Sequence, residues 1–364
     1  MELRDFKKSG LTLFVGAALA LTLSAPGHTD ELGFLNWTDY MPEDTVSEFE
    51  SEQGVSVVQY TYSELDDAEA LLQAGNTGYG VAVVSMEVVE RLRARDLLAA
   101  FDGSLLPNAT GVDVTLMERF YQQYPSTRGF IQPFLWGYTG LAFDRSKITA
   151  RIPDAPLDSW ALLFDPENAA RLADCGVYII NSPEEVIAIA LTYLGRDPKS
   201  ADPRDMDDAL EAISAIAPYV QDIESEHYDV FLAGEACLAL TWNTEALGII
   251  METESTDLAF LAPKEGTNIW LDSLIIPSDA PDPQLAHEFV NYILSPKTAA
   301  MLEDWNSTPS AVPAARAFMD DSAERNPMIL LSDEETESWF VPRALALDEK
   351  VTLNRRWWRI FLGI

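Results

Sequence analysis

Residues 32–85 read LGFLNWTDYMPEDTVSEFESEQGVSVVQYTYSELDDAEALLQAGNTGYGVAVVS, in which short apolar runs alternate with amphipathic ones. The apolar runs predict strands at 32–37, 55–62 and 80–85. The last of these is continuously apolar, as in a parallel sheet that is covered on both faces. Pro42 and Gly54 bound one predicted helix, and residues 64–74 predict a second. Strand–helix–strand alternation of this kind predicts an α/β fold with right-handed crossovers.

A second α/β region follows a β-rich stretch, FIQPFLWGYTGLAFD at 130–144, which has no helical pattern and could pass between two lobes. The apolar runs CGVYII at 175–180 and ACLALTW at 236–242 each precede a predicted helix. WLDSLIIP at 270–277 predicts a further strand, and PQLAHEFVNYILS at 283–295 predicts an amphipathic helix. Because no low-complexity linker separates the regions, we expect two lobes between which the chain crosses more than once.

The composition is that of a globular protein with an acidic surface. The chain has 364 residues, of which 48% are apolar, and this length is about right for two domains. Lys and Arg number 24 and Asp and Glu 59, so the formal net charge is −35. Phosphate binding needs a basic surface, so the charge argues against nucleic acid as a partner. The acidic excess either serves solubility or attracts a cationic ligand.

The N-terminus predicts an export signal over residues 1–27. Basic residues precede the apolar run LTLFVGAALALTL at 11–23, which is too short to span a bilayer and has the length of a signal-peptide core. We expect cleavage between Ser24 and Asp30. No cysteine near that site could carry a lipid anchor, and no other apolar stretch is long enough to span a membrane. The mature protein is therefore expected to be soluble outside the cytoplasm.

The sequence contains two cysteines, Cys175 and Cys237. In an oxidising compartment an even pair predicts one disulfide. Such a bridge would contribute about 4 kcal/mol in the chain-entropy model. The alternative is a pair of buried free thiols.

Motifs of the common enzyme classes are missing from the sequence. It has no G-x-S-x-G elbow, no G-x-G-x-x-G loop and no Walker loop. Its histidines, His28, His227 and His287, are scattered and make no convincing zinc set with the cysteines. Paired carboxylates could support hydrolysis, but nothing local favours it. We therefore expect no catalytic residue, no metal site and no cofactor.

Tryptophans stand beside carboxylates at three predicted strand ends, where open α/β sheets bind their ligands. The pairs are Trp37 with Asp39 in NWTDY, Trp242 with Glu245 in TWNTE, and Trp270 with Asp272 in IWLD. In IWLD the two residues are two apart, so both point to the same face of a strand. An indole supplies an apolar wall and a cation–π face, and a carboxylate supplies a charged acceptor. Together they suit a ligand with ammonium heads and a hydrocarbon middle, although each pair alone could be core packing beside a solvated acid.

Several segments, in order, resemble the polyamine-binding proteins of bacterial ABC importers, and the putrescine binders most of all. Between about Leu32 and about Ala314 they are LNWTDYMPEDTVSEFESEQGVSV, YGVAVVS, QPFLWGYTGLAFD, DSWALLFDPENAARLADCGV, NSPEEV, AGEACLALTW, PKEG and LDSLIIPSDA. The resemblance implies a type II periplasmic-binding-protein fold, in which two α/β lobes joined by a multi-strand hinge close over a ligand in the cleft between them. It also implies a periplasmic monomer that is not an enzyme and that delivers its ligand to the permease subunits of an ABC transporter.

The resemblance further implies where the lobes and the disulfide lie. The first lobe is expected to comprise residues 28–138 plus about 258–303. The second lobe is expected to comprise residues 139–257 plus about 304–364. Cys175 and Cys237 fall on the positions that form the disulfide of the family.

Ten ligand-binding residues are implied by the same resemblance. Tryptophans would stack along the methylene chain, carboxylates would neutralise or hydrogen-bond the amines, and hydroxyl groups would complete the wall. In that order they are Trp37, Trp242 and Trp270; Asp39, Glu185, Glu245 and Asp272; and Thr38, Tyr40 and Ser85. Structural roles compete at three positions. Glu185 could close a capping box on Ser182. Tyr40 could staple the following helix, and Ser85 could cap one.

Some positions depart from the family. Glu245 stands where the putrescine binder has Asp, and Trp270 stands where it has Phe, which should favour a longer or bulkier amine. Near Thr308, where the family offers a Tyr, Trp305 is a candidate substitute. The C-terminal NRRWWRIFLGI also departs from the polar end of the family. It predicts a helix that packs its Trp and Ile residues, or else a contact with a partner or a membrane.

The sequence therefore predicts a protein that captures a polyamine, such as putrescine or spermidine, for an ABC importer. One alternative is the same fold binding another cation, such as a quaternary amine, an amino acid amide or a γ-glutamylated amine. Another is a sensor subunit that presents its ligand to a membrane receptor.

Overall fold

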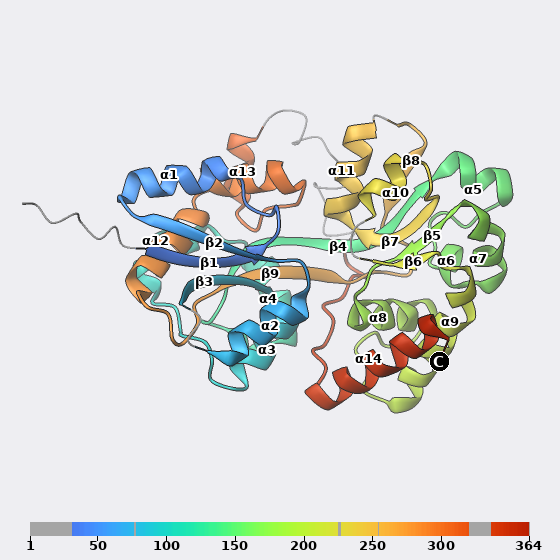
Figure 1. Cartoon of the computed structure of the whole chain (residues 1–364), viewed down its shortest axis with the longest axis horizontal. Helices are drawn as coiled ribbons and strands as arrows, with labels where there is room; N and C mark the ends of the chain where they lie inside the picture. The colour runs from blue at the N-terminus through green and yellow to red at the C-terminus, as the bar shows by residue number, and fades with distance from the viewer. Residues whose placement is uncertain (1–30, 76–77, 225–226, 254, 320–335, 364) are drawn as a thin grey trace, which may run out of the picture.

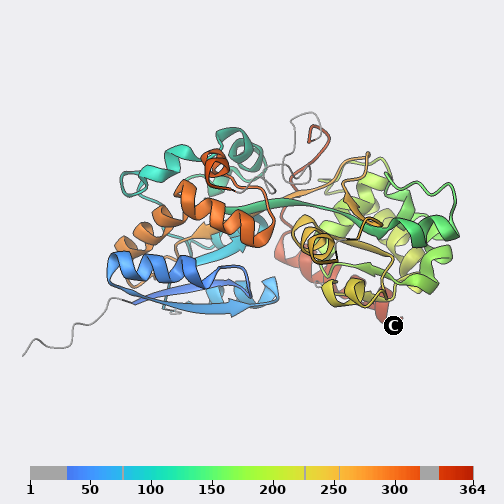
Figure 2. The same ribbon diagram turned by 90° about the horizontal axis from the view of Figure 1, so that it is seen from above.

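The structure is a computed structural model that describes residues 31–75, 78–224, 227–253, 255–319 and 336–363. The expected signal at 1–27 and its cleavage site lie outside these residues. Two lobes lie side by side, each built from a sheet with helices on it (Figures 1 and 2). This arrangement confirms the predicted two-lobed α/β fold.

Strands of both lobes form one continuous sheet in the order β2-β1-β3-β9-β4-β7-β5-β6, and β8 also pairs with β4. In the first lobe, β1 (Glu31–Trp37), β2 (Ser56–Tyr62) and β3 (Tyr79–Ser85) are parallel. Strand β9 (Ile269–Ile275) joins β3 in the antiparallel sense. The carboxyl ends of the three parallel strands therefore meet at one edge of the sheet.

The second lobe contributes its own group of strands to the same sheet. The parallel strands are β5 (Val177–Ile179), β6 (Asp222–Ile223) and β7 (Leu238–Trp242). Strand β7 pairs antiparallel with the C-terminal half of β4 (Gln132–Asp144), and so does β8 (Leu258–Leu261). The carboxyl end of β7 thus faces the first lobe.

The long strand β4 connects the two lobes. Residues 132–138 pair with β9, residues 139–143 pair with β7, and both views show β4 running from one lobe into the other (Figures 1 and 2). A later segment of the chain also runs alongside these connecting strands. Phe340 forms an isolated β-bridge with Asn268, the residue just before β9. The expectation that residues 130–144 pass between the lobes is confirmed.

Helices cover both faces of each half of the sheet (Figure 1). In the first lobe these are α1 (Glu43–Gln53), α2 (Leu65–Ala74), α3 (Met86–Arg93), α4 (Val114–Gln123), α12 (Pro283–Ile293) and α13 (Pro296–Asn306). In the second lobe they are α5 (Arg145–Arg151), α6 (Ala161–Phe164), α7 (Pro166–Leu172), α8 (Pro183–Tyr193), α9 (Pro203–Ile216), α10 (Tyr228–Leu232), α11 (Asn243–Thr253) and α14 (Leu347–Leu362). Short 3-10 helices are η1 (Gly103–Leu105), η2 (Pro107–Gly111), η3 (Pro125–Thr127), η4 (Ala173–Cys175), η5 (Ala217–Tyr219) and η6 (Pro313–Phe318).

The first helix begins and ends where the sequence predicts. Pro42 precedes its first turn, and its fixed φ suits a helix start. Gly54 ends it with φ 69°, a left-handed conformation that glycine adopts without steric cost. This compact helix returns the chain to the sheet, so β2 can pair alongside β1.

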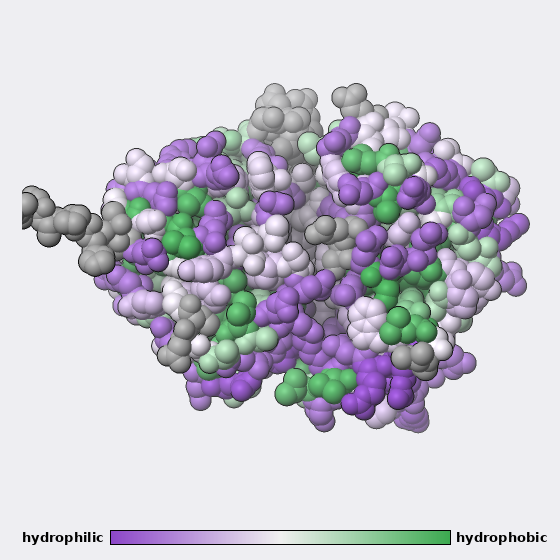
Figure 3. Space-filling model, in the orientation of Figure 1, coloured by the Kyte–Doolittle hydropathy of each residue, from purple (hydrophilic) through white to green (hydrophobic). Residues whose placement is uncertain are grey.

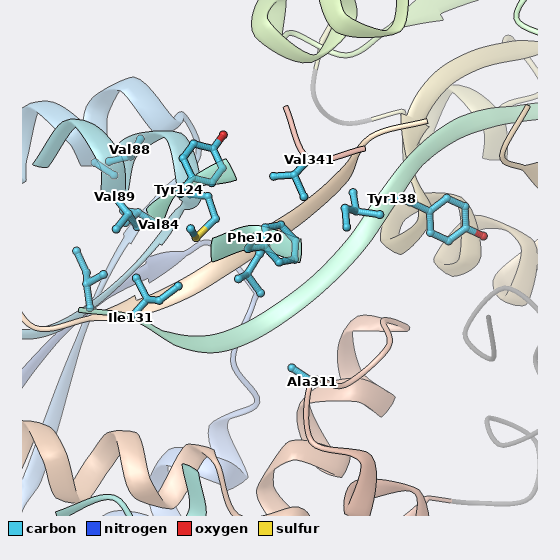
Figure 4. Packing of buried hydrophobic residues seen from close by; sticks show 14 of the residues in the cluster. Val84, Val88, Val89, Phe120, Tyr124, Ile131, Tyr138, Ala311 and Val341 are labelled. Carbon is cyan, nitrogen blue, oxygen red and sulfur yellow. The ribbon is translucent and has the colours of Figure 1, made fainter. Parts of the chain in front are cut away.

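The buried apolar side chains form three clusters that stabilise the two lobes. One cluster packs Phe34 and Phe49 against helix α12 on one face of the first-lobe sheet. A second lies on the opposite face, includes Tyr138 of β4 (Figure 4), and continues into the second lobe, where it contains Ala142 and Phe260. The third fills the second lobe and contains Trp160 and the fully buried Trp357 of α14. The prediction of a packed C-terminal helix is therefore confirmed for Trp357.

The lobe boundaries stay a prediction, but one strand pairing and one packing contact suggest that two segments belong to the other lobe. Strand β8 pairs with β4 inside the second-lobe group, so residues 258–261 are better counted with that lobe than with the first. Ala315 and Met319 pack in the first-lobe cluster, so the segment after α13 is better counted with the first lobe.

Cys175 and Cys237 form a disulfide with their Cα atoms 5.5 Å apart. They are separated by 62 residues, and the bridge ties the end of η4 to the residue before β7. The alternative of two free thiols is wrong, and the pairing implied by the family resemblance is confirmed. Closing a loop of this length restricts the unfolded chain and contributes about 4 kcal/mol in the chain-entropy model.

Oxidised protein that is unfolded in denaturant should therefore show no thiol that reacts with a labelling reagent, because both sulfur atoms are in the bridge. The same sample should show two reactive thiols after reduction, which serves as the positive control. Two labelled cysteines without reductant would refute the disulfide.

Candidate functional site

A cleft of about 640 Å³ lies between the lobes, and all ten residues expected to bind ligand line it. In the view of Figure 3, hydrophilic side chains gather over the middle of the molecule between the two lobes. Trp37, Ser85 and Trp242 are the last residues of β1, β3 and β7. The cleft therefore lies at strand ends, where open α/β sheets bind ligands.

Asp272 and Trp270 reach the cleft from β9, the strand that continues the first-lobe sheet toward β4. Asp272 pairs in register with Ser85 of β3, and Trp270 pairs with Gly137 of β4. A Cβ at Gly137 would lie 2.3 Å from the Trp270 ring and 2.1 Å from the Asn243 side-chain oxygen. Only glycine therefore allows the indole to lie this close to β4.

The Asp272 carboxylate is buried, with 7% of the residue exposed. The Tyr40 hydroxyl donates a hydrogen bond to it at 3.0 Å, and the Tyr40 ring packs on Phe134 of β4. Burial raises the pKa of Asp272 to about 7, and the nearby Glu87 and Glu185 act in the same direction. Within the described ranges no Lys, Arg or His forms an ion pair with it. Asp272 is thus a buried acid without a cation.

Glu185 is a second buried carboxylate, and it accepts hydrogen bonds from several side chains. Thr139 donates at 2.7 Å, Asn268 at 2.8 Å and Ser182 at 2.9 Å. The Trp242 indole donates at 3.2 Å. The expected alternative, a capping box on the Ser182 backbone, is wrong, because the contact is with the Ser182 hydroxyl instead. Glu185 therefore fixes the orientation of Trp242, and its own pKa is raised by burial.

Glu245 lines the cleft, but its oxygens are engaged within the second lobe. The buried His227 donates its backbone N–H to one carboxylate oxygen, and its Nδ1 lies 3.1 Å from the other. The Thr241 hydroxyl donates to the same second oxygen. A ligand would meet a carboxylate that already has partners, so a direct role for Glu245 stays a prediction.

The turn after β1 forms one lip of the cleft. The Thr38 hydroxyl contacts the Tyr62 carbonyl oxygen at 3.3 Å, and Asp39 is exposed with φ 57°. The Trp305 indole donates to the Asp39 carbonyl oxygen at 2.8 Å, so Trp305 reaches the cleft as expected. Thr308, by contrast, is buried and is not part of the lining.

Ser85 occupies the N-cap position of α3, but its side chain makes no capping hydrogen bond. The expected capping role is therefore wrong. Its hydroxyl is buried and has no hydrogen-bond partner among the residues that the structure places. Since Ser85 lines the cleft beside Asp272, this hydroxyl is available to a ligand.

The lining of the cleft is strongly acidic. The carboxylates are Asp39, Glu64, Asp66, Glu87, Glu184, Glu185, Glu245 and Asp272, and the single amine on the described wall is that of Lys350. Apolar walls come from Trp37, Trp242, Trp270, Trp305 and Trp358. A cavity with this charge attracts a cation, and the indoles can cover its hydrocarbon part.

The described part of the chain has neither a cluster of metal ligands nor a helix that could span a membrane. No group of three or more His, Cys, Asp or Glu residues could hold a metal ion there. In the same residues, no helix combines the length and the apolar character needed to cross a membrane.

Residues 44–329 match the family model described as bacterial extracellular solute-binding protein. The chain belongs to this family. It is 33% identical over 327 residues to the putrescine-binding periplasmic protein of Escherichia coli (strain K12), covering 87% of this chain and 88% of that protein. It is 30% identical over 334 residues to a putrescine/agmatine-binding protein of Pseudomonas aeruginosa, covering 90% and 91%.

The fold of this solute-binding protein is also found among solved structures. The spermidine/putrescine ABC transporter substrate-binding protein of Streptococcus pneumoniae superimposes with a TM-score of 0.77 and 19% sequence identity. The match covers 92% of this chain and 99% of the other. At this identity the likeness concerns the fold, and it agrees with the resemblance that the sequence motifs indicated.

Several residues of the cleft were not expected from the sequence. They are Ser63, Glu64, Leu65, Asp66, Glu87, Asn181, Glu184, Tyr228, Thr244, Lys350, Asn354 and Trp358. Glu87 follows β3 by two residues, so the strand-end rule that selected Ser85 could also have found it. Lys350 and Trp358 lie on α14, and nothing in the sequence indicates that this helix returns to the cleft.

Proposed function

We propose that this solute-binding protein captures a polyamine, such as putrescine or spermidine, and delivers it to the permease subunits of an ABC importer. The observation that carries the proposal is the charge of the cleft, where the described residues place eight carboxylates and one amine between tryptophan walls. An ammonium group taken from water needs an ionised partner, since its desolvation is otherwise uncompensated. Relatives named for putrescine binding support the same ligand class.

The roles of the expected residues follow from their positions. Asp272, with Tyr40 holding one of its oxygens, would neutralise one ammonium group. Trp270 and Trp242 would cover the methylene chain, with Glu185 orienting the Trp242 indole. Trp37, Thr38, Asp39, Ser85 and Glu245 would complete the wall around them.

The proposal includes binding without catalysis, a periplasmic location and a monomeric state. The names of relatives such as the Escherichia coli periplasmic binding protein support the first two. Presentation of the ligand to a receptor instead of a permease uses the same cleft, and a neighbouring permease and ATPase gene would favour import.

A thermal-shift panel tests the ligand class. Putrescine, cadaverine or spermidine at about 100 times its dissociation constant should raise the unfolding free energy by about 2.7 kcal/mol. Butylamine has the same carbon chain as putrescine with one ammonium group, so it should give a much smaller shift. Choline tests the quaternary-amine alternative. The proposal fails if no diamine or triamine shifts the transition, or if butylamine or choline shifts it as much.

A further inference from the structure

Lys350 brings an ammonium group of the protein itself to the wall of the acidic cleft. It lies on α14 of the second lobe, and its side chain is 12% exposed. Its Nζ donates to Asp66 at 2.5 Å and to Glu69 at 3.1 Å, and both acids are on α2 of the first lobe. The lysine therefore links the two lobes at the wall of the cleft.

The acids around Lys350 are paired with the protein's own cations. Glu69 is buried and also accepts two hydrogen bonds from Arg91, at 2.8 Å and 2.9 Å. Arg91 in turn lies 3.5 Å from Glu184 at the start of α8. Burial and the charge of Arg91 lower the pKa of Lys350, but its contacts with Asp66 and Glu69 outweigh them and raise it. This part of the wall consequently has little charge left for a ligand.

Four acids elsewhere on the described wall lack such a direct ion pair, although Glu87 lies near enough to Arg91 to raise the pKa of that arginine. Asp272, Glu185, Glu87 and Asp39 form no ion pair within the portion of the chain described here. Glu87 lies close enough to Asp272 and to Glu185 to raise the pKa of each. The ammonium groups of a ligand should therefore bind along this part of the wall, at the carboxyl ends of β1 and β3 and beside Asp272 in the middle of β9.

We infer that Lys350 occupies the place that a third ammonium group would take, so that the cleft prefers a diamine to a triamine. The inference rests on the proposed function. A third ligand charge near Asp66 would have to displace Lys350 from two carboxylates or remain beside a like charge, and both are unfavourable. This preference for a diamine opposes the expectation from Trp270, whose larger ring favours a longer amine. The preference arises from the charge of the ligand, whereas the expectation from Trp270 concerns its length.

The test compares putrescine and spermidine by calorimetry in Lys350→Met, which keeps most of the aliphatic stem and removes the charge. The ratio of spermidine to putrescine affinity should rise about tenfold or more, because Asp66 and Glu69 become available to the third ammonium group. Lys264→Met is the matched control, since Lys264 pairs with Asp158 on the surface outside the cleft and is 62% exposed. Its ratio should equal that of the parent.

A second variant separates charge from lobe contact. In Lys350→Met/Asp66→Asn the cation and one of its acids are both removed, so the affinity ratio should return most of the way to that of the parent. If Lys350→Met weakens both amines equally, the lysine only holds the lobes together and the inference is wrong. A ratio within about threefold of the parent also overturns it. Failure of the parent to bind either amine would instead refute the proposed function.

Discussion

Asp272→Asn is expected to lower amine affinity about 30- to 5,000-fold, the cost of removing one partner of a buried charged pair. Asparagine keeps the shape of the side chain and can still accept the hydrogen bond from Tyr40. Asp272 has no cationic partner in the described part of the empty protein, so folding should not suffer. Calorimetry with putrescine and the melting temperature of the empty protein measure the two effects.

The melting temperature of the empty Asp272→Asn protein should stay the same or rise, because folding raises the pKa of the Asp272 carboxyl. Folding raises the pKa of Asp272 from 3.8 to about 7, so between these pH values the folded protein binds more protons than the unfolded chain. This carboxyl therefore lowers the unfolding free energy as pH rises through that interval. Asp272→Asn removes this penalty above about pH 7.

The control for this variant is Asp154→Asn, which makes the same change of charge at an exposed aspartate outside the cleft. It should leave amine affinity unchanged. If Asp272→Asn unfolds the protein, or binds amines within about threefold of the parent, Asp272 is a structural residue and the site is misplaced.

Amine affinity should also fall steeply with acidification. Putrescine stays doubly protonated in this range, because the pKa of an alkylamine lies near 10. One carboxyl with a pKa of about 7 should reduce affinity about 25-fold between about pH 7.5 and about pH 5.5, since its neutral form cannot pair with an ammonium group. Binding at neutral pH should correspondingly release protons, which calorimetry detects as a dependence of the heat on the ionisation enthalpy of the buffer.

The pH dependence should flatten in Asp272→Asn, which lacks the titrating group. Glu185, whose pKa burial also raises, would account for any slope that remains. An affinity that stays constant from about pH 7.5 to about pH 5.5 would contradict the ionic role of these acids.

Local patterns in the sequence were enough to predict the scaffold. Pro42 and Gly54 set the ends of α1, and the continuous apolar run at 80–85 became the buried strand β3. The two-residue spacing of Trp270 and Asp272 correctly placed both on one side of β9. These features depend on residues close in the chain, so their geometry follows from strand and helix periodicity.

The contacts between distant segments could not be predicted in this way. Glu245 is expected from the sequence to contact the ligand, but His227, which lies 18 residues earlier, contacts both of its carboxylate oxygens. Lys350 reaches Asp66 across a separation of 284 residues because α14 packs in the second lobe beside the cleft. The first pairing depends on how segments pack within the second lobe and the second on how the two lobes meet, and no local pattern contains that information.

Direct titration with putrescine is the measurement that tests the binding of a polyamine in this cleft most directly. The protein is first freed of any bound ligand by unfolding and refolding with the disulfide intact, and the titration is run by calorimetry at about pH 8, where Asp272 is ionised. We expect about one putrescine per chain, in competition with spermidine for the same site. Absence of binding heat with both amines, or binding that persists unchanged in Asp272→Asn, would contradict it.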